Sequence, residues 1–294
     1  MPPRQTLQSA LERERPLQIA GAINAYTARL AERAGFQALY VSGAGVANAS
    51  FGLPDLGFTT LDQVAEDVRR ITATTSLPVL VDIDTGWEED LFTGRTMTVM
   101  HEAGAAAVHL EDQVSMKRCG HRPGKALVSR EEMVARVEAA VKTKPDPSMV
   151  LMARTDAAAV EGLPAAIERA QAYVAAGADM IFAEALHTLE EYRAFTRAVS
   201  VPVLANITEF GKTPLFTRDE LHSAGIAMAL YPLSAFRAMS AAARDVYAAL
   251  RRDGTQQAVI DRMQTRAELY DMLNYAEYER KADEKLNRKD ERSR

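Results

Sequence analysis

The only cysteine of this chain, Cys119, lies in the run KRCGH at residues 117–121. Its basic neighbours, Lys117 and His121 among them, make the surroundings of the thiol electropositive, which tunes a thiol pKa for reaction. The glycines and the proline at residues 120–124 favour a loop over a helix. We therefore predict a reactive thiol on a loop that covers a catalytic site. A small buried thiol is the alternative, and basic neighbours fit that role less well.

Other uses of this cysteine are disfavoured because it is isolated in the sequence. Cys119 and His121 offer two metal ligands, and no second Cys/His pair stands at the spacing of a structural zinc site. A single cysteine excludes a disulfide within the chain, which suits a reducing compartment. The opening segment MPPRQTLQSALERERP lacks the apolar run of a signal peptide, so we expect a cytoplasmic protein.

Polar residues recur at the ends of short apolar runs. Seven residues after the glycine of an Ala-Gly pair come Ser42, Glu111 and Glu184; four residues after a proline come Asp82 and Asn206; the run VLMAR ends at Arg154. Helix capping would explain Ser or Asn singly. Long charged side chains at such positions need partners, which favours a shared site.

Eight such runs, most of them followed by a helical segment, predict the fold. They are PLQIAGAIN, RAGFQALYVS, LPVLVDID, EAGAAAVHLE, SMVLMARTD, AAGADMIFAE, VPVLANIT and SAGIAMALYP. Strands that are apolar on both faces are typical of parallel sheets. The glycines at positions 35, 104, 177 and 225 stand where helices would end in left-handed caps. Eight βα units predict an α/β protein, a TIM-type (β/α)8 barrel with its strand ends at one rim.

The sequence after the eighth run predicts extra helices. We expect one barrel domain over residues 1–294, with a helical extension at about 234–285 and a charged tail at about 286–294. The extension reads as two long amphipathic helices, at 234–252 and 255–285, whose surplus apolar face predicts packing on another subunit. The net charge of −5 argues against a nucleic-acid partner, and no apolar run is long enough for a membrane span.

The acids of the rim suggest a metal site. Asp82, Asp84 and Glu111 offer hard oxygen ligands, which suit Mg²⁺ or Mn²⁺ with water and substrate oxygens completing the shell. A D-x-D pair brings its carboxylates together only if the strand has ended before the second aspartate.

The cations of the chain suggest an anionic substrate. Arg154, Arg237, Arg266, Lys117 and His121 are the candidates, and several fixed cations suit a molecule with more than one carboxylate. Asn206 and Thr208 could add hydrogen bonds, and the backbone of residues 42–45 could bind an anion.

Several motifs resemble those of the isocitrate lyase and phosphoenolpyruvate mutase superfamily. They are VDIDTG, LEDQV, KRCGH, MARTDA, LANITEFGKTPLF and ALYPLSAFRAM, and the resemblance runs from about residue 16 to about residue 280. The string KRCGHRPGK distinguishes the chain from the mutases, which lack the cysteine motif, and from isocitrate lyases, which are longer and continue differently. One departure is Ala44, where relatives often carry glycine.

The resemblance implies roles for individual residues. Asp82 and Asp84 would hold Mg²⁺ largely through water, with Glu111 nearby; Cys119, Lys117 and His121 would be catalytic; Tyr40 and Glu184 are alternatives for the base. The implied substrate contacts are Ser42, Gly43, Ala44, Asp55, Gly120, Arg154, Glu184, Asn206, Thr208, Arg237 and Arg266. Phe182, Leu230 and Pro232 would line a pocket for a methyl group.

The resemblance also implies an activity and an assembly. The expected reaction is Mg²⁺-dependent cleavage of 2-methylisocitrate to pyruvate and succinate, as in propionate breakdown through the methylcitrate cycle, with Cys119 donating a proton to carbon. The final helices would swap between subunits of a homotetramer built from two dimers. Alternatives are cleavage of isocitrate or another 2-hydroxy acid, a phosphoryl mutase, and a metabolite-binding barrel without catalysis.

Overall fold

In the computed structural model, which describes residues 5–115, 117–118, 120 and 124–292 and side chains up to residue 285, eight parallel strands close into a barrel. The strands are β1 (Leu17–Gly21), β2 (Ala38–Val41), β3 (Val79–Asp82), β4 (Ala107–Glu111), β5 (Val150–Thr155), β6 (Met180–Ala183), β7 (Val203–Asn206) and β8 (Met228–Tyr231). Strand β8 closes the barrel on β1, with Met228 opposite Leu17. The predicted barrel is confirmed, and each strand lies within one of the eight predicted runs.

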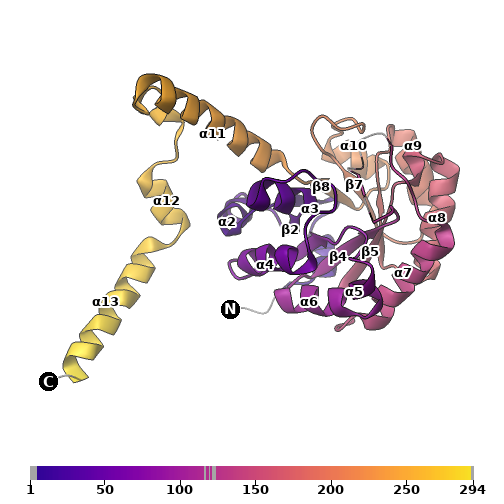
Figure 1. The fold of residues 1–294 in the computed structure, drawn as a ribbon, viewed down its shortest axis with the longest axis horizontal. Helices are drawn as coiled ribbons and strands as arrows, with labels where there is room; N and C mark the ends of the chain where they lie inside the picture. Colours follow the sequence, from indigo (N-terminus) through magenta and orange to yellow (C-terminus); the bar gives the residue numbers. More distant parts are fainter. Residues whose placement is uncertain (1–4, 116, 119, 121–123, 293–294) are drawn as a thin grey trace. The chain divides into compact units, whose positions relative to one another are not determined.

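Helices alternate with the strands and surround them (Figure 1). They are α2 (Ala25–Arg33), α3 (Gly43–Gly45) continued by the π-helical turn η1 (Val46–Ser50), α4 (Leu61–Thr72), α5 (Glu89–Phe92), α6 (Arg95–Ala103), α7 (Arg130–Thr143), the 3₁₀ turn η2 (Ala157–Ala159), α8 (Leu163–Ala175), α9 (Leu189–Ala198) and α10 (Arg218–Ser223). The loops that lead from strands into these helices form one rim of the barrel, where the predicted site residues are concentrated.

Local side chains set the ends of these helices. The hydroxyl of Thr60 accepts a hydrogen bond from the Gln63 amide, and the Gln63 side chain accepts one from the Thr60 amide, so α4 begins with a capping box. Gly104 ends α6 with φ of 93°, and Gly177 follows α8 with φ of 103°. Glycine occupies this left-handed region without the strain that a Cβ would bring. The predicted left-handed caps are thus confirmed at both positions.

A short N-terminal helix, α1 (Leu7–Arg13), fills the amino end of the barrel. Its buried residues Leu7, Ala10 and Leu11 belong to the same apolar cluster as the inward-facing side chains Leu17 and Met228. Burying these side chains removes apolar surface from water at the end of the barrel opposite the polar rim. This helix was not predicted from the sequence, and its position leaves the carboxyl end as the place for a site.

The chain divides into two compact units, Met1–Arg237 and Ala238–Arg294. Helix α11 (Ser234–Asp253) agrees with the predicted helix at 234–252. The single helix predicted at 255–285 is wrong, because this stretch forms η3 (Gln257–Arg262), α12 (Arg266–Met272) and α13 (Tyr275–Arg292). A capping box between Thr265 and Glu268 starts α12, and Asn274, with φ of 53°, separates α12 from α13.

Helix α13 continues through the charged stretch after residue 285 as far as Arg292. Within the described part of the chain, no helix has both the length and the apolar character needed to cross a bilayer.

Candidate active site

A cavity of about 360 Å³ opens where the strands end at the carboxyl rim. The sequence-predicted residues that line it are Tyr40, Ser42, Ala44, Asp55, Asp82, Lys117, Gly120, Arg154, Phe182, Glu184, Asn206, Thr208, Leu230, Pro232 and Arg237. The wall also contains Glu209, Phe210, Gly211 and Leu233. None of these four was predicted as a site residue, although all four lie in the quoted runs LANITEFGKTPLF and ALYPLSAFRAM.

Asp82 and Asp84 come together because β3 has ended. The strand stops at Asp82, and Asp84 takes φ of 47°, so the backbone turns instead of alternating its side chains. The Asp84 amide donates to Asp82 Oδ1 at 3.1 Å, and the Gly43 amide donates to Asp82 Oδ2 at 3.1 Å. A Cβ on Gly43 would lie 3.0 Å from Asp84 Oδ1, so glycine permits this close approach.

Lys117 supplies a buried positive charge beside these acids. Its Nζ lies 2.6 Å from Asp55 Oδ1 and 2.7 Å from Asp84 Oδ1, and its side chain is 4% exposed. Burial alone would lower the pKa of Lys117, but Asp84 and Asp55 raise that pKa well above its ordinary value. Lys117 is therefore an ammonium ion that bridges two loops of the rim.

The carboxyl groups of the rim differ in their readiness to ionise. Burial would raise the pKa of Asp82, but His109, Lys117 and Arg154 together hold that pKa below its ordinary value. Burial raises the pKa of Asp84 to about 7, with Lys117 opposing and Asp82 adding to the rise. Burial also raises the pKa of Glu111 well above its ordinary value. Asp82 is therefore the most firmly ionised of these three acids.

His109, on β4, is a residue that the sequence analysis missed. Its Nε2 lies 2.9 Å from the Tyr40 hydroxyl and 3.5 Å from Asp82 Oδ1, and the Tyr40 hydroxyl lies 3.3 Å from Asp82 Oδ2. Burial lowers the pKa of His109 to about 4, so the imidazole is neutral. Burial, with Asp82, raises the pKa of Tyr40 well above its ordinary value. These groups form a polar floor beneath the cavity, with the Tyr40 phenol protonated.

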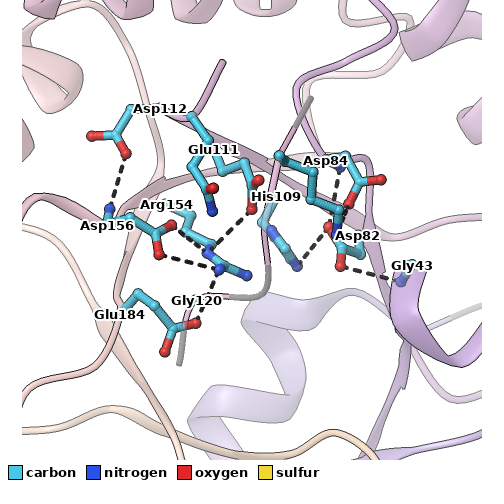
Figure 2. Close-up of polar contacts among 12 residues, drawn as sticks. Gly43, Asp82, Asp84, His109, Glu111, Asp112, Gly120, Arg154, Asp156 and Glu184 are labelled. Atoms are coloured by element: carbon cyan, nitrogen blue, oxygen red, sulfur yellow. Dashed lines mark hydrogen bonds and ion pairs between the residues drawn. The ribbon is translucent and has the colours of Figure 1, made fainter. Parts of the chain in front are cut away.

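Arg154, at the end of β5, is the cation around which the opposite wall is arranged (Figure 2). Its Nε lies 3.0 Å from Asp156 Oδ2 and 3.4 Å from Glu111 Oε2, and its Nη2 lies 3.2 Å from Glu184 Oε2. The guanidinium carbon also lies 5.0 Å from the centre of the Phe182 ring. A guanidinium held on three sides presents its remaining donors in a fixed direction.

The mouth of the cavity carries a second arginine. Arg237 Nε lies 3.7 Å from Glu209 Oε2, and its guanidinium carbon lies 5.5 Å from the centre of the Phe210 ring. Phe210 is 92% exposed and has φ of 59°, which strains a residue with a Cβ. Asn206 and Thr208 lie between the two arginines along the chain and contribute polar side chains to the wall.

The donor set at Asp82, Asp84 and Glu111 fits a hard divalent cation. Asp84 Oδ1 faces the Lys117 ammonium at 2.7 Å and Glu111 Oε2 faces Arg154 Nε at 3.4 Å, whereas the buried Glu111 Oε1 accepts no hydrogen bond from the described residues. Buried carboxylate oxygens of this kind suit Mg²⁺ or Mn²⁺. Within the described part of the chain, no three acidic, histidine or cysteine side chains converge closely enough to hold a metal alone. Water and substrate oxygens would therefore complete the shell.

Some predicted residues do not line the cavity. Gly43, Asp84 and Glu111 contact its wall from behind, through Asp82, Lys117 and Arg154 respectively. Arg266 is exposed on α12 in the second unit. Cys119 and His121 lie outside the residues that the structure describes.

Known proteins resemble this chain in sequence over nearly its whole length. The family model of phosphoenolpyruvate phosphomutase matches residues 7–251. The 2-methylisocitrate lyase of Escherichia coli (strain K12) is 63% identical over 282 residues, which cover 96% of this chain and 95% of that protein. The enzyme of the same name from Salmonella typhimurium is 62% identical, with 96% of both chains covered.

Solved structures share the fold at lower identity. A crystal structure of 2,3-dimethylmalate lyase has a TM-score of 0.86 and 33% identity, with 95% of both chains covered. A phosphonopyruvate hydrolase in complex with oxalate and Mg²⁺ has a TM-score of 0.80 and 29% identity, covering 93% of this chain and 95% of the other.

Proposed function

The chain belongs to the phosphoenolpyruvate phosphomutase family, in the isocitrate lyase and phosphoenolpyruvate mutase superfamily, and is a carbon–carbon lyase; we propose that it cleaves 2-methylisocitrate to pyruvate and succinate. The observation that carries this proposal is the pairing of a firmly ionised acid, Asp82, with two arginines in one cavity. Asp82 marks the acidic side, Arg154 the opposite wall and Arg237 the mouth. A tricarboxylate with a hydroxyl group matches such a division of charge.

We propose that Asp82 and Asp84 hold Mg²⁺, with Glu111 close behind and Mn²⁺ as a substitute. The phosphonopyruvate hydrolase structure, which holds Mg²⁺ and oxalate, supports a metal in this family. When bound, the ion would withdraw charge from the hydroxyl and carboxylate groups of a substrate. The ordinary role of Lys117 would then be to hold Asp55 and Asp84 in place from the other side.

The carboxylates of the substrate are proposed to lie against the cations of the wall. Arg154, fixed by Asp156 and Glu184, would receive one carboxylate, and Arg237 with Asn206 and Thr208 would receive another. The Tyr40 phenol remains protonated in this proposal, which leaves Glu184 as the better of the two predicted bases. Phe182, Leu230 and Pro232 would surround the methyl group, a contact that contributes only about 1–3 kcal/mol to discrimination.

The proposed reaction breaks one carbon–carbon bond of the substrate and moves protons, with no oxidant or reductant. The substrate hydroxyl loses its proton, its oxygen becomes the keto oxygen of pyruvate, and the adjacent carbon–carbon bond breaks. The electron pair of that bond stays on the succinate carbon, where Arg154 would stabilise the developing charge. Cys119 would then donate a proton to that carbon, with Lys117 and His121 as its basic neighbours in the sequence.

We further propose that the second unit packs on another subunit, in the homotetramer that the resemblance implies. Its large apolar side chains support this, because Tyr247 is 72%, Ile260 55% and Tyr278 62% exposed. Single chains rarely leave such side chains in water in this number.

The test is to incubate the purified protein, with Mg²⁺ and a reductant, separately with 2-methylisocitrate and with isocitrate. Pyruvate and glyoxylate are then followed. Higher kcat/KM for pyruvate release from 2-methylisocitrate is expected. Equal or better cleavage of isocitrate would overturn the methyl pocket, and product from neither would overturn the proposed substrate.

A further inference from the structure

Lys125 is a buried cation outside the cavity wall and without a role in the proposed reaction. Its side chain is 2% exposed. Its Nζ donates to the carbonyl oxygen of Gly120 at 2.7 Å and to Asp156 Oδ1 at 2.7 Å. Burying an ammonium is costly unless strong acceptors surround it, so these two contacts define where Lys125 sits. The ammonium thus joins a backbone peptide of the cavity wall to the carboxylate of Asp156, the residue directly after β5.

Gly120 is held against the site from its other side. A Cβ on this residue would lie 2.5 Å from Arg154 Nη2 and 2.6 Å from Glu184 Cγ, so its backbone passes directly over both side chains. Figure 2 shows Gly120 beside Arg154 and Glu184. The Gly120 peptide is therefore confined between the Arg154–Glu184 pair and the ammonium of Lys125.

Asp156, which binds the Lys125 ammonium, is itself held in place by a network of hydrogen bonds. Its Oδ2 accepts from Arg154 Nε at 3.0 Å, and its backbone amide donates to Asp112 Oδ1 at 2.9 Å. Asp112 Oδ2 in turn accepts from the Thr155 hydroxyl at 2.7 Å and from the Tyr173 hydroxyl at 2.9 Å. All of these groups are buried, and a fully satisfied buried network resists rearrangement.

We propose that Lys125 is a positioning residue that fixes the Gly120 peptide relative to the guanidinium of Arg154. One carboxylate, Asp156, orients both cations, so the place of the peptide and the direction of the guanidinium are set together. The positional part of this proposal stands on the contacts alone. Its catalytic consequence, that Lys125 sets the loop for proton donation by Cys119, rests on the proposed lyase function.

The first test uses the single cysteine as a reporter of Gly120. Cys119 precedes Gly120 in the chain, so release of the Gly120 carbonyl is expected to free the thiol for reaction. In Lys125→Met, the rate of alkylation by iodoacetamide should rise about tenfold over wild type. A change of this size is expected when one charge-assisted hydrogen bond is lost. An unchanged or lower rate would overturn the proposal. This readout needs no substrate, so it stands even if the proposed reaction fails.

Two further variants separate positioning from general loosening. Gly120→Ala displaces the same peptide from its other side, so its alkylation rate should also rise, and adding it to Lys125→Met should have little further effect. Lys125→Arg keeps a cation and donors beside Asp156, and its rate should lie nearer to wild type than to Gly120→Ala. Full additivity of the double variant, or an Arg variant as reactive as Gly120→Ala, would contradict a positioning role.

The matched control is Lys144→Met. Lys144 Nζ lies 3.0 Å from Asp179 Oδ2 in a half-buried pair that precedes β5 and β6, at the amino end of the barrel. Its alkylation rate and kcat should equal those of wild type. With 2-methylisocitrate as substrate, Lys125→Met should lower kcat about tenfold and leave KM nearly unchanged, because Lys125 does not line the cavity. A rise in KM with unchanged kcat would assign Lys125 to substrate binding instead.

Discussion

Lys117 places its ammonium nitrogen 2.7 Å from Asp84 Oδ1, on one of the two acids proposed to hold the metal. The same nitrogen lies 2.6 Å from Asp55 Oδ1, on the loop that follows η1. Two segments distant in sequence are thus joined through one buried cation. The balance of charge at this rim depends on Lys117 whenever no divalent ion is bound.

Replacement of Lys117 by methionine should destabilise the metal-free protein. Removing one partner from a buried ion pair costs about 3–5 kcal/mol, because the remaining charges stay buried without compensation. Mg²⁺ should restore part of the lost stability, since it binds the folded protein and supplies positive charge to the same acids. Thermal denaturation with and without Mg²⁺ measures both effects. Lys144→Met is the control, and its stability should not respond more strongly to Mg²⁺ than that of wild type. A metal-free Lys117→Met as stable as wild type would contradict this account.

Removing the charge of Asp82 should weaken metal binding. In Asp82→Asn the affinity for Mg²⁺ or Mn²⁺, measured by calorimetry, should fall at least about tenfold, and chelation of the metal should abolish cleavage by wild type. Asp67→Asn removes a buried carboxylate from α4 that accepts a hydrogen bond from Ser50, away from the cavity. Its metal affinity should be that of wild type. Equal affinities in Asp82→Asn and wild type would move the metal away from β3.

Substitution of the only cysteine should separate binding from turnover. Cys119→Ser keeps the size of the side chain but raises the pKa of the donor, so the protonation of carbon should slow by about 10²–10⁴. Substrate affinity, measured by calorimetry or protection against thermal unfolding, should change little. Near-normal kcat in this variant would remove Cys119 from the proton-transfer step.

Enlarging the apolar part of the cavity should lower the preference for a methyl group. Leu230, 1% exposed on β8, lines the cavity, whereas Met228 on the same strand is equally buried and does not. Truncation of either to alanine should cost about 2–5 kcal/mol of stability. Only Leu230→Ala should reduce the ratio of kcat/KM for 2-methylisocitrate over isocitrate, by about tenfold. An equal shift in Met228→Ala would assign the effect to general loosening of the barrel.

The fold could be predicted from the sequence because each strand is a short apolar run and characteristic residues stand where helices and strands end. Gly104 and Gly177 mark helix ends, and Glu111 and Glu184 mark strand ends that follow them. The rim residues could be located because parallel strands all point the same way. The broken helix after residue 255 was missed because its apolar spacing outweighed a local signal, the capping pair Thr265 and Glu268.

Side-chain contacts between residues that are distant in the sequence could not be predicted in the same way. His109 lies inside an apolar strand, and its partner Tyr40 is 69 residues away, so nothing in the local pattern separates it from a core residue. Lys125 ends the run KRCGHRPGK, yet only the fold brings Asp156 to it. Contacts of this kind arise from barrel closure, whereas periodicity reports the neighbours along one strand or helix.

Within the described part of the chain, helix α1 closes the amino end of the barrel to ligands. Because Leu7, Ala10 and Leu11 fill the amino end of the barrel, a ligand cannot travel along the barrel axis. Among the described residues, the cavity of the site opens at the carboxyl rim, where Arg237 and Phe210 line it. In a carbon–carbon lyase with one open rim, the product nearer the rim would leave before the deeper one.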